Sequence, residues 1–267
     1  MLGKNLNIKE SQVRLFRIAK HFDEICKSNS IPYYMLGGTM LGAIRHHGFI
    51  PWDDDMDFGV PIEYYERLRQ LLKDNLPPDI RVCEYENCKG CRTVFIKLDD
   101  THSCIDDKCV DLPLEEKLGL NIDIFPLVTC NKSGFKVDSI LFLTKFNSIV
   151  FTEPISGSRL KHHIKKMLQK LMPFRQNTLL RYIWHLTVSM NEGDCYGNLF
   201  GRYRRKEIVS KRIFGEPTPY PFEDTTFYGP TLSDEYLKLL YGDYMKLPPL
   251  SQQVNHNTGV FERIETS

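Results

Sequence analysis

The segment Leu36–Pro61, which reads LGGTMLGAIRHHGFIPWDDDMDFGVP, restricts the fold and the chemistry of this chain more than any other. Its aspartate cluster ends with Asp55 and Asp57 in D-x-D spacing, followed by the apolar-leaning Phe-Gly-Val. Because alternate residues of a strand point to the same side, both carboxylates are predicted to face one point. Two such carboxylates repel each other unless a hard cation lies between them. Mg²⁺ suits that position, because it takes few carboxylates together with substrate phosphate oxygens.

A Gly-Gly pair stands at the start of the same segment, directly after a short apolar run. Gly37 and Gly38 present backbone N–H groups that no side chain obstructs, which is a suitable cradle for a phosphate. Thr39 is predicted to cap a short helix over residues 39–46. The glycine pair and the carboxylates together predict metal-assisted chemistry at a phosphate.

The composition is that of an ordinary globular protein, with 267 residues, 42% apolar and 26% charged residues. The net charge of +1 argues against a dedicated nucleic-acid binder. Residues 1–10 are polar and resemble no secretory signal, and the most apolar stretch, residues 137–151, is interrupted by polar residues. We therefore expect a cytoplasmic protein, with a location at the inner face of the cytoplasmic membrane left open.

The eight cysteines are unevenly distributed, because five of them fall within residues 83–109. Cys88-x2-Cys91 followed by Cys104-x4-Cys109 resembles the spacing of structural zinc ligands. The alternative is a set of ordinary half-buried thiols in a reducing compartment. We favour the thiols, since a tetrahedral site needs four converging ligands, and zinc stays open.

Strands alternate with helices up to about residue 126, and helical patterns dominate beyond it. Strands are predicted over residues 33–36, 56–60, 80–85, 93–98 and 120–125. Helices are predicted over residues 10–29, 39–46, 62–75, 135–151, 160–172, 178–190 and 233–241. This predicts an α+β fold in which residues 1–126 form a mixed sheet core with a Cys-rich insertion near 83–109. Residues 127–267 are predicted to be mostly helical and to complete the active site within one compact unit.

Asp123 is the third acid of interest, because it stands between two isoleucines in the strand pattern LNIDIF. A carboxylate flanked by β-branched apolar residues rarely faces bulk solvent. A small-residue turn, a D-x-D strand and a single acid on a later strand are the arrangement of the nucleotidyltransferase fold. There the first pair holds the metal ion, and the third acid completes the site or orients the attacking hydroxyl.

Several segments also resemble one family. Residues 37–61 are similar to the hallmark stretch of LicD-type proteins, the bacterial phosphocholine transferases related to the animal fukutins, and LNIDIFPL resembles their second motif. Residues 221–223 with 236–237, followed by 241–245 and 247–249, resemble their C-terminal motif. The resemblance covers nearly the whole chain in order. It implies transfer of a substituted phosphate from a CDP-alcohol donor, typically CDP-choline, to a sugar hydroxyl of a cell-surface glycan or lipid-linked glycan, with release of CMP.

The resemblance also implies roles for individual residues. Asp55 and Asp57 would hold Mg²⁺ or Mn²⁺, and Asp123 would complete the metal site or act as the base. The residues expected to line the phosphates or the nucleotide are Gly37, Gly38, Thr39, Arg45, His46 and Lys97. The C-terminal motif adds Glu223 and Asp243 to the expected substrate-binding residues.

Some of these residues also have simpler interpretations. Lys97 fits a solvated strand end equally well, and Glu223 and Asp243 fit structural caps. Asp53 and Asp54 fit turn carboxylates better than metal ligands. The basic run 159–170 fits a solvated helix face better than a contact with anionic lipid headgroups, which stays open as a peripheral membrane contact.

Three other functions stay open at this point. The nearest is transfer of glycerol phosphate or ribitol phosphate from the matching CDP-alcohol. The second is true nucleotidyl transfer, which releases pyrophosphate. The third is a regulator that binds a nucleotide or a metal ion without catalysis, or an interaction module held together by zinc. Three converging acids argue against a binding module.

Overall fold

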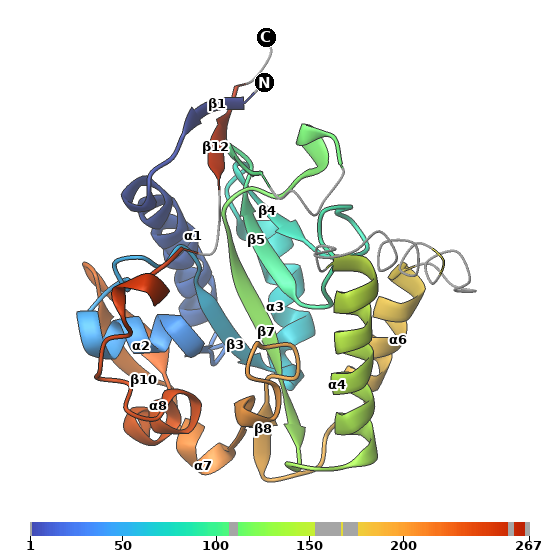
Figure 1. Cartoon of the computed structure of the whole chain (residues 1–267). Helices are drawn as coiled ribbons and strands as arrows, with labels where there is room; N and C mark the ends of the chain where they lie inside the picture. Colours follow the sequence, from blue (N-terminus) through green and yellow to red (C-terminus); the bar gives the residue numbers. More distant parts are fainter. Residues whose placement is uncertain (1, 107–111, 153–166, 168–175, 256–258, 265–267) are drawn as a thin grey trace.

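The structure is a computed structural model that describes residues 2–106, 112–152, 167, 176–255 and 259–264. Its centre is a mixed sheet in which the strands run β2-β3-β7-β5-β4 (Figure 1). These strands are β2 (Tyr34–Met35), β3 (Asp57–Pro61), β7 (Asn121–Cys130), β5 (Ile96–Asp100) and β4 (Ile80–Cys83). Only β3 and β7 run parallel along this path, and the other neighbours are antiparallel. The predicted mixed sheet flanked by helices is confirmed.

One core lies between this sheet and helices α1 (Ile8–Ser28) and α3 (Ile62–Asn75). Both helices contact β7, and Figure 1 shows them beside the central strands. The predicted helix 62–75 matches α3, and 10–29 matches α1 within two residues. Ile18, Ala19 and Phe22 of α1 are fully buried, as the helical period predicts. Val13 of the same predicted face is exposed, and Leu15 is buried instead.

A second core lies beyond the other side of β7, where α4 (Phe135–Asn147) packs against α6 (Gln176–Val188). A π-helical turn, Ser148–Thr152, follows α4. The two helices run side by side in Figure 1. The predicted helix 160–172 and the basic run 159–170 lie almost entirely outside the described residues. None of the helices in the described ranges combines the length and apolarity that a membrane span requires.

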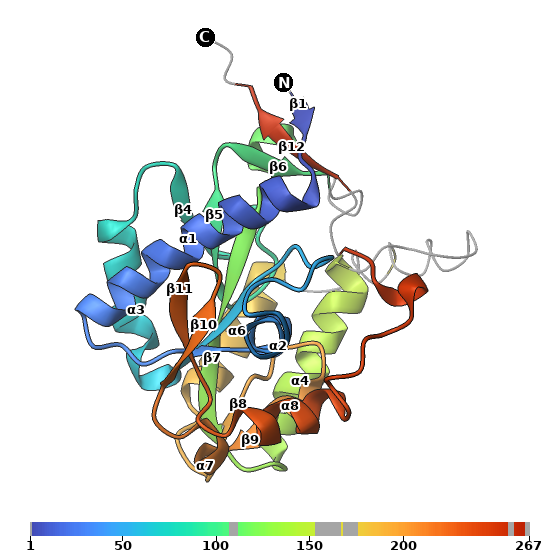
Figure 2. The same cartoon turned by 90° about the vertical axis from the view of Figure 1, so that its left-hand side faces the viewer.

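The region after residue 126 contains more strands than predicted. β8 (Cys195–Gly197) extends the sheet by pairing with β7 and with β9 (Ile208–Ser210), and β10 (Thr218–Phe222) forms a hairpin with β11 (Thr225–Gly229). β12 (Val260–Arg263) joins β1 (Leu2–Asn5) and β6 (Ser103–Ile105), as Figure 2 shows near the termini. These strands have three to five residues, which is too short for a periodic signal in the sequence.

The shorter helices lie around this frame. α2 (Gly37–His46) packs against α8 (Ser233–Tyr241), and α7 (Lys211–Phe214) lies beside α8. Three 3₁₀ turns cover Leu114–Glu116, Arg204–Glu207 and Leu250–Gln252. The prediction that Thr39 caps α2 is wrong, because the helix already begins at Gly37 and its cap is Leu36.

Candidate active site

The parallel pairing of β3 with β7 brings two of the predicted acids together. Asp57 is the direct register partner of Asp123. The N–H of Leu36 donates to the carbonyl oxygen of Asp57 at 2.9 Å. The glycine turn that follows Leu36 therefore begins beside Asp57, the first residue of β3. Thr39 reinforces this contact, because its hydroxyl accepts from the N–H of Asp57 at 2.8 Å.

Glycine is required at the start of α2 for conformation and for space. Gly37 has φ +47°, and a Cβ built there would lie 3.6 Å from both the Asp57 carboxylate and the Tyr241 hydroxyl. A Cβ on Gly38 would lie 2.9 Å from the Asp53 carboxylate. The N–H of Gly37 donates to the Tyr236 hydroxyl at 3.1 Å. The first turn of α2 therefore opens directly beside the carboxylates.

Asp53, Asp55, Asp57 and Asp123 form a carboxylate cluster, and these acids cannot all be charged without a counter-ion. Burial and the neighbouring Asp55 and Asp123 raise the pKa of Asp57 well above its usual value. Burial, followed by repulsion from Asp55, raises the pKa of Asp53 to about 9. Burial also raises the pKa of Asp123. Asp53 is thus a buried member of the cluster, beyond the turn role that we favoured for it.

Lys97 lies at this cluster, because β5 places it opposite Asp123. Its ammonium donates to Asp123 Oδ1 at 2.5 Å and to the Asn121 side chain at 3.1 Å. Burial is the largest influence on the pKa of Lys97 and lowers it, but the charge and hydrogen bond of Asp123, together with Cys91 and Asp57, raise the pKa overall. Lys97 is therefore part of a partly buried ion pair with Asp123 and is not a solvated charge at a strand end.

Sequence reasoning missed Glu207, which the structure adds to the cluster. Its carboxylate accepts from the Asn198 side chain and from the N–H of Tyr203, both at 2.7 Å. Burial raises the pKa of Glu207 to about 7, and its charge contributes to the raised pKa of Asp57. Glu207 stands in a basic, irregular segment, and only the apolar Ile-Val after it hints at burial.

Two tyrosines of α8, Tyr236 and Tyr241, were also missed as site residues. Burial raises the pKa of both hydroxyls, and the charges of Asp57 and Glu207 contribute. Both belong to the stretch that resembles the C-terminal motif of the family, but neither of them was predicted to have a role in the site.

Four other predicted residues lie at the edge of this cluster or away from it. Arg45 donates to the Tyr244 carbonyl at 2.8 Å and to the neighbouring His46 ring at 2.9 Å. Burial lowers the pKa of His46. Glu223 accepts from the N–H of Phe49 at 3.1 Å and so joins the β10–β11 turn to the end of α2. Asp243 is exposed.

The cluster provides the hard oxygen ligands that Mg²⁺ prefers, although in the described part of the chain no three His, Cys, Asp or Glu side chains already converge on one point. Mg²⁺ needs only one or two protein carboxylates, because waters and substrate phosphates supply the rest. Burial is the main cause of the raised pKa of Asp53 and Asp57, and a bound cation would offset both that burial and the mutual repulsion of the acids. The donor set therefore fits a divalent cation.

Cys88, Cys91 and Cys104, the described cysteines proposed for zinc, do not converge on one point. The Cys83 thiol donates to Cys88, and this hydrogen bond lowers the pKa of Cys88 to about 6. Cys91 contacts the Cys83 carbonyl and Thr93, whereas Cys104 contacts the carbonyls of Ile105 and Leu114. Cys109 lies outside the described residues, so the four-cysteine site stays a prediction.

Comparison with known proteins identifies the region that carries the cluster. Residues 30–152 match the family model described as LicD/FKTN/FKRP, nucleotidyltransferase domain. Residues 30–152 are a LicD-family domain. This LicD domain contains the glycine turn, Asp55, Asp57, Lys97 and Asp123, whereas Glu207 and the α8 tyrosines lie outside it.

Two relatives of different extent support the LicD assignment. The lipopolysaccharide cholinephosphotransferase LicD of Haemophilus influenzae is 26% identical over 95% of this chain and 97% of that protein. The human ribitol 5-phosphate transferase FKRP is 36% identical over 20% of this chain and 11% of that protein. The similarity to the first relative therefore extends well beyond the LicD domain.

Proposed function

We propose that this protein is a Mg²⁺-dependent transferase that moves phosphocholine from CDP-choline to a sugar hydroxyl of a cell-surface glycan precursor, releasing CMP. The observation that carries the proposal is the pairing of Asp57 with Asp123 on adjacent strands, directly beside the N-terminal turn of α2. A helix N-terminus attracts phosphate and the acids attract a cation, so one position can bind a metal-bound phosphate.

The relatives support the general class of reaction. One is named for transfer of choline phosphate in lipopolysaccharide and the other for transfer of ribitol 5-phosphate. Both names describe the transfer of an alcohol phosphate. The extended similarity to the first favours choline as the alcohol and a lipopolysaccharide, capsule or teichoic acid precursor as the acceptor. Ribitol phosphate or glycerol phosphate is the nearest alternative.

Asp55 and Asp57 are the residues that would hold Mg²⁺ or Mn²⁺. When bound, the ion would neutralise charge on the phosphate oxygens and on the departing CMP. The N–H groups of Gly38 and Thr39 belong to the first turn of α2, where no intrahelical acceptor exists, and they would bind phosphate oxygens.

We assign Asp123 the role of base. Its Oδ1 already holds the Lys97 ammonium, and a second cation on the same carboxylate would be repelled by that charge. Asp123 would take the proton of the sugar hydroxyl as the hydroxyl oxygen bonds to phosphorus and the bond from phosphorus to CMP breaks. The raised pKa of Asp123 makes it a better base than an ordinary aspartate.

The test is CMP release from CDP-choline, CDP-glycerol, CDP-ribitol and CTP, with Mg²⁺ and with EDTA. We expect EDTA-sensitive CMP from CDP-choline, with water as a slow acceptor. Asp55→Asn and Asp57→Asn should each lower the rate by about 100-fold or more while the protein stays folded. Asp224→Asn is the matched control, because Asp224 is exposed and lies outside the cluster.

Other products would give other conclusions. CMP from another CDP-alcohol would change the donor, and pyrophosphate from CTP would make the protein a nucleotidyltransferase. Near-normal turnover in the Asp55 or Asp57 variant would refute the metal assignment.

A further inference from the structure

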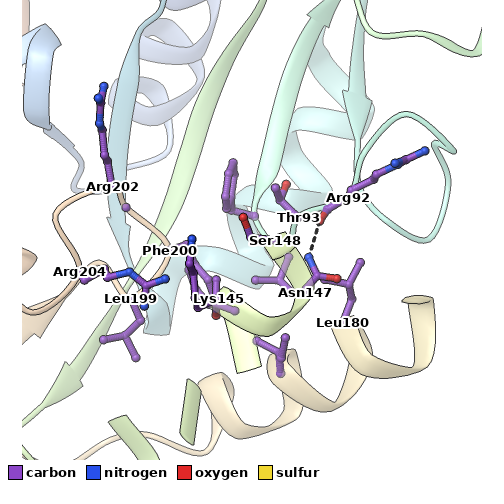
Figure 3. Close-up of a pocket in the computed structure, with 15 residues that line it drawn as sticks. Arg92, Thr93, Lys145, Asn147, Ser148, Leu180, Leu199, Phe200, Arg202 and Arg204 are labelled. Carbon is purple, nitrogen blue, oxygen red and sulfur yellow. Dashed lines mark hydrogen bonds between the residues drawn. The ribbon is translucent and has the colours of Figure 1, made fainter. Parts of the chain in front are cut away.

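A cavity of about 430 Å³ lies between α4, α6, the segment that precedes β5 and the loop 199–204 (Figure 3). Part of its wall is apolar and includes two aromatic rings. The apolar lining residues are Val94, Phe95, Leu180, Ile183, Leu199 and Phe200. Such a wall suits the less polar face of a sugar ring or another ring of similar size.

The charged part of the wall has one sign. Arg92, Lys145, Arg202 and Arg204 line the cavity, and its lining includes no aspartate or glutamate. Figure 3 shows the Arg204 side chain extending toward Lys145. The Arg92 and Arg202 side chains extend away from the cavity in the same view, so Arg204 and Lys145 supply the positive charge that faces it. The cavity therefore favours an anionic ligand.

Arg204 is held in place at a conformational cost. Its φ is +54°, a left-handed conformation that costs a residue with a Cβ about 1 kcal/mol or more. The N–H of Arg204 donates to the Gly201 carbonyl, and its guanidinium donates to the Leu141 carbonyl at 3.2 Å. Such strain is typical of binding sites, and this one orients a guanidinium whose remaining donors suit a phosphate.

The cavity adjoins the carboxylate cluster at two points. The Phe95 ring that lines it lies 5.2 Å from the Lys97 ammonium, which pairs with Asp123. Gly201 of the cavity wall lies against the Glu207 carboxylate, so that even a Cβ at Gly201 would overlap it. A ligand in the cavity would therefore extend toward the reacting groups.

The strand order places this cavity and the α2 turn on opposite sides of the acids. The turn follows β2, Asp57 and Asp123 lie on β3 and β7, and Lys97 and the cavity lie on the side of β5. Phosphoryl transfer needs the attacking and leaving oxygens roughly in line on opposite sides of phosphorus. A donor phosphate at the turn would leave the cavity side to the acceptor.

We propose that this cavity binds the acceptor through an anionic group, and that the acceptor is a sugar phosphate rather than a neutral sugar. The proposal rests on the function proposed above. Arg204 is the main contact to the phosphate, Lys145 is a second, and the Phe95 and Phe200 rings cover the sugar.

The test uses glucose 6-phosphate, glucose and CMP as calorimetric probes of the whole protein. We expect glucose 6-phosphate to bind at least about 10-fold more tightly than glucose, because a charge-assisted contact is lost with the neutral sugar. Arg204→Gln should weaken glucose 6-phosphate binding by about 10-fold or more. Arg205→Gln is the control, since Arg205 lies outside the cavity lining and pairs with Asp138. Lys145→Gln, a change at an exposed residue of the cavity wall, serves as a second variant if Arg204→Gln does not fold.

CMP competition separates the acceptor from the donor. We expect glucose 6-phosphate to bind equally well with CMP present, because the two ligands occupy different sides of the acids. Displacement by CMP would place the nucleotide in the cavity and overturn the proposal. Equal binding of glucose, or unchanged binding in the Arg204 or Lys145 variant, would also overturn it. Failure of the proposed function would appear separately, as no CMP release from any CDP-alcohol.

Discussion

Replacing Asp53 by asparagine should stabilise the metal-free protein, and the gain should grow with pH. Asp53 is 9% exposed, and its pKa is raised from 3.8 to about 9 by burial and by Asp55. An acid with a raised folded-state pKa binds its proton more tightly when folded. The unfolded chain is therefore favoured as pH rises between the two pKa values. Asparagine keeps the shape and a hydrogen-bond donor but has no proton to lose.

The size of the gain follows from the two pKa values. Between the two pKa values, each pH unit lowers the wild type's free energy of unfolding by about 1.4 kcal/mol. The loss is therefore about 2 kcal/mol at pH 5 and about 6 kcal/mol at pH 8. The difference of about 4 kcal/mol between the two pH values is the quantity to measure. It applies without a divalent cation, because a bound cation would lower the pKa of Asp53 toward its usual range.

The assay is urea unfolding followed by circular dichroism, at pH 5 and pH 8, with EDTA in every sample. Asp224→Asn is the control, because its side chain is 75% exposed and its removal should change stability by less than about 0.5 kcal/mol. The reasoning is refuted if Asp53→Asn gains the same stability at both pH values, or if it is less stable than wild type at pH 8.

Three further predictions concern the same cluster. Lys97→Gln removes the ammonium that lowers the pKa of Asp123, so this pKa should rise and activity should fall. The acidic limb of the pH–rate profile should then move to higher pH, and an unchanged limb would contradict Asp123 as the base. Tyr236→Phe removes the acceptor of the Gly37 N–H and should cost about 1 kcal/mol in urea unfolding; an unchanged midpoint would contradict that contact. Mg²⁺ should raise the melting temperature of the wild type more at pH 8 than at pH 5, since more of the acids seek a counter-ion at high pH; equal shifts would argue against a cation in the cluster.

Much of the sheet and its first helices could be predicted because their signals are local. The predicted helix 62–75 coincides with α3, and the alternating pattern of LNIDIF marks the start of β7. The strands after residue 190 could not be predicted, because each has only three to five residues and depends on a distant partner. Pro219 and Pro221 in β10 also remove the usual strand signal.

The acids divide in the same way. D-x-D spacing and a lone acid between isoleucines are local patterns, so the sequence singles out Asp55, Asp57 and Asp123, and the structure pairs Asp57 with Asp123. The contribution of Glu207 depends on a turn that returns it to β3 from far along the chain, and no local pattern carries that information. For Glu223 the C-terminal motif suggested a role in substrate binding, but its carboxylate accepts from the N–H of Phe49 and so joins two turns.

The sequence by itself determined the local features of this protein: a glycine turn, the acids that follow it, and the LicD-family domain over residues 30–152. The tertiary structure alone decided which charges share one space. It places Asp57 opposite Asp123 and pairs Lys97 with Asp123. It also brings Glu207 and the basic cavity next to these acids. The physical reason is that residue types and local periods are written along the chain. The separation of two charges, and hence their pKa and their ligand, depends on how distant strands pair.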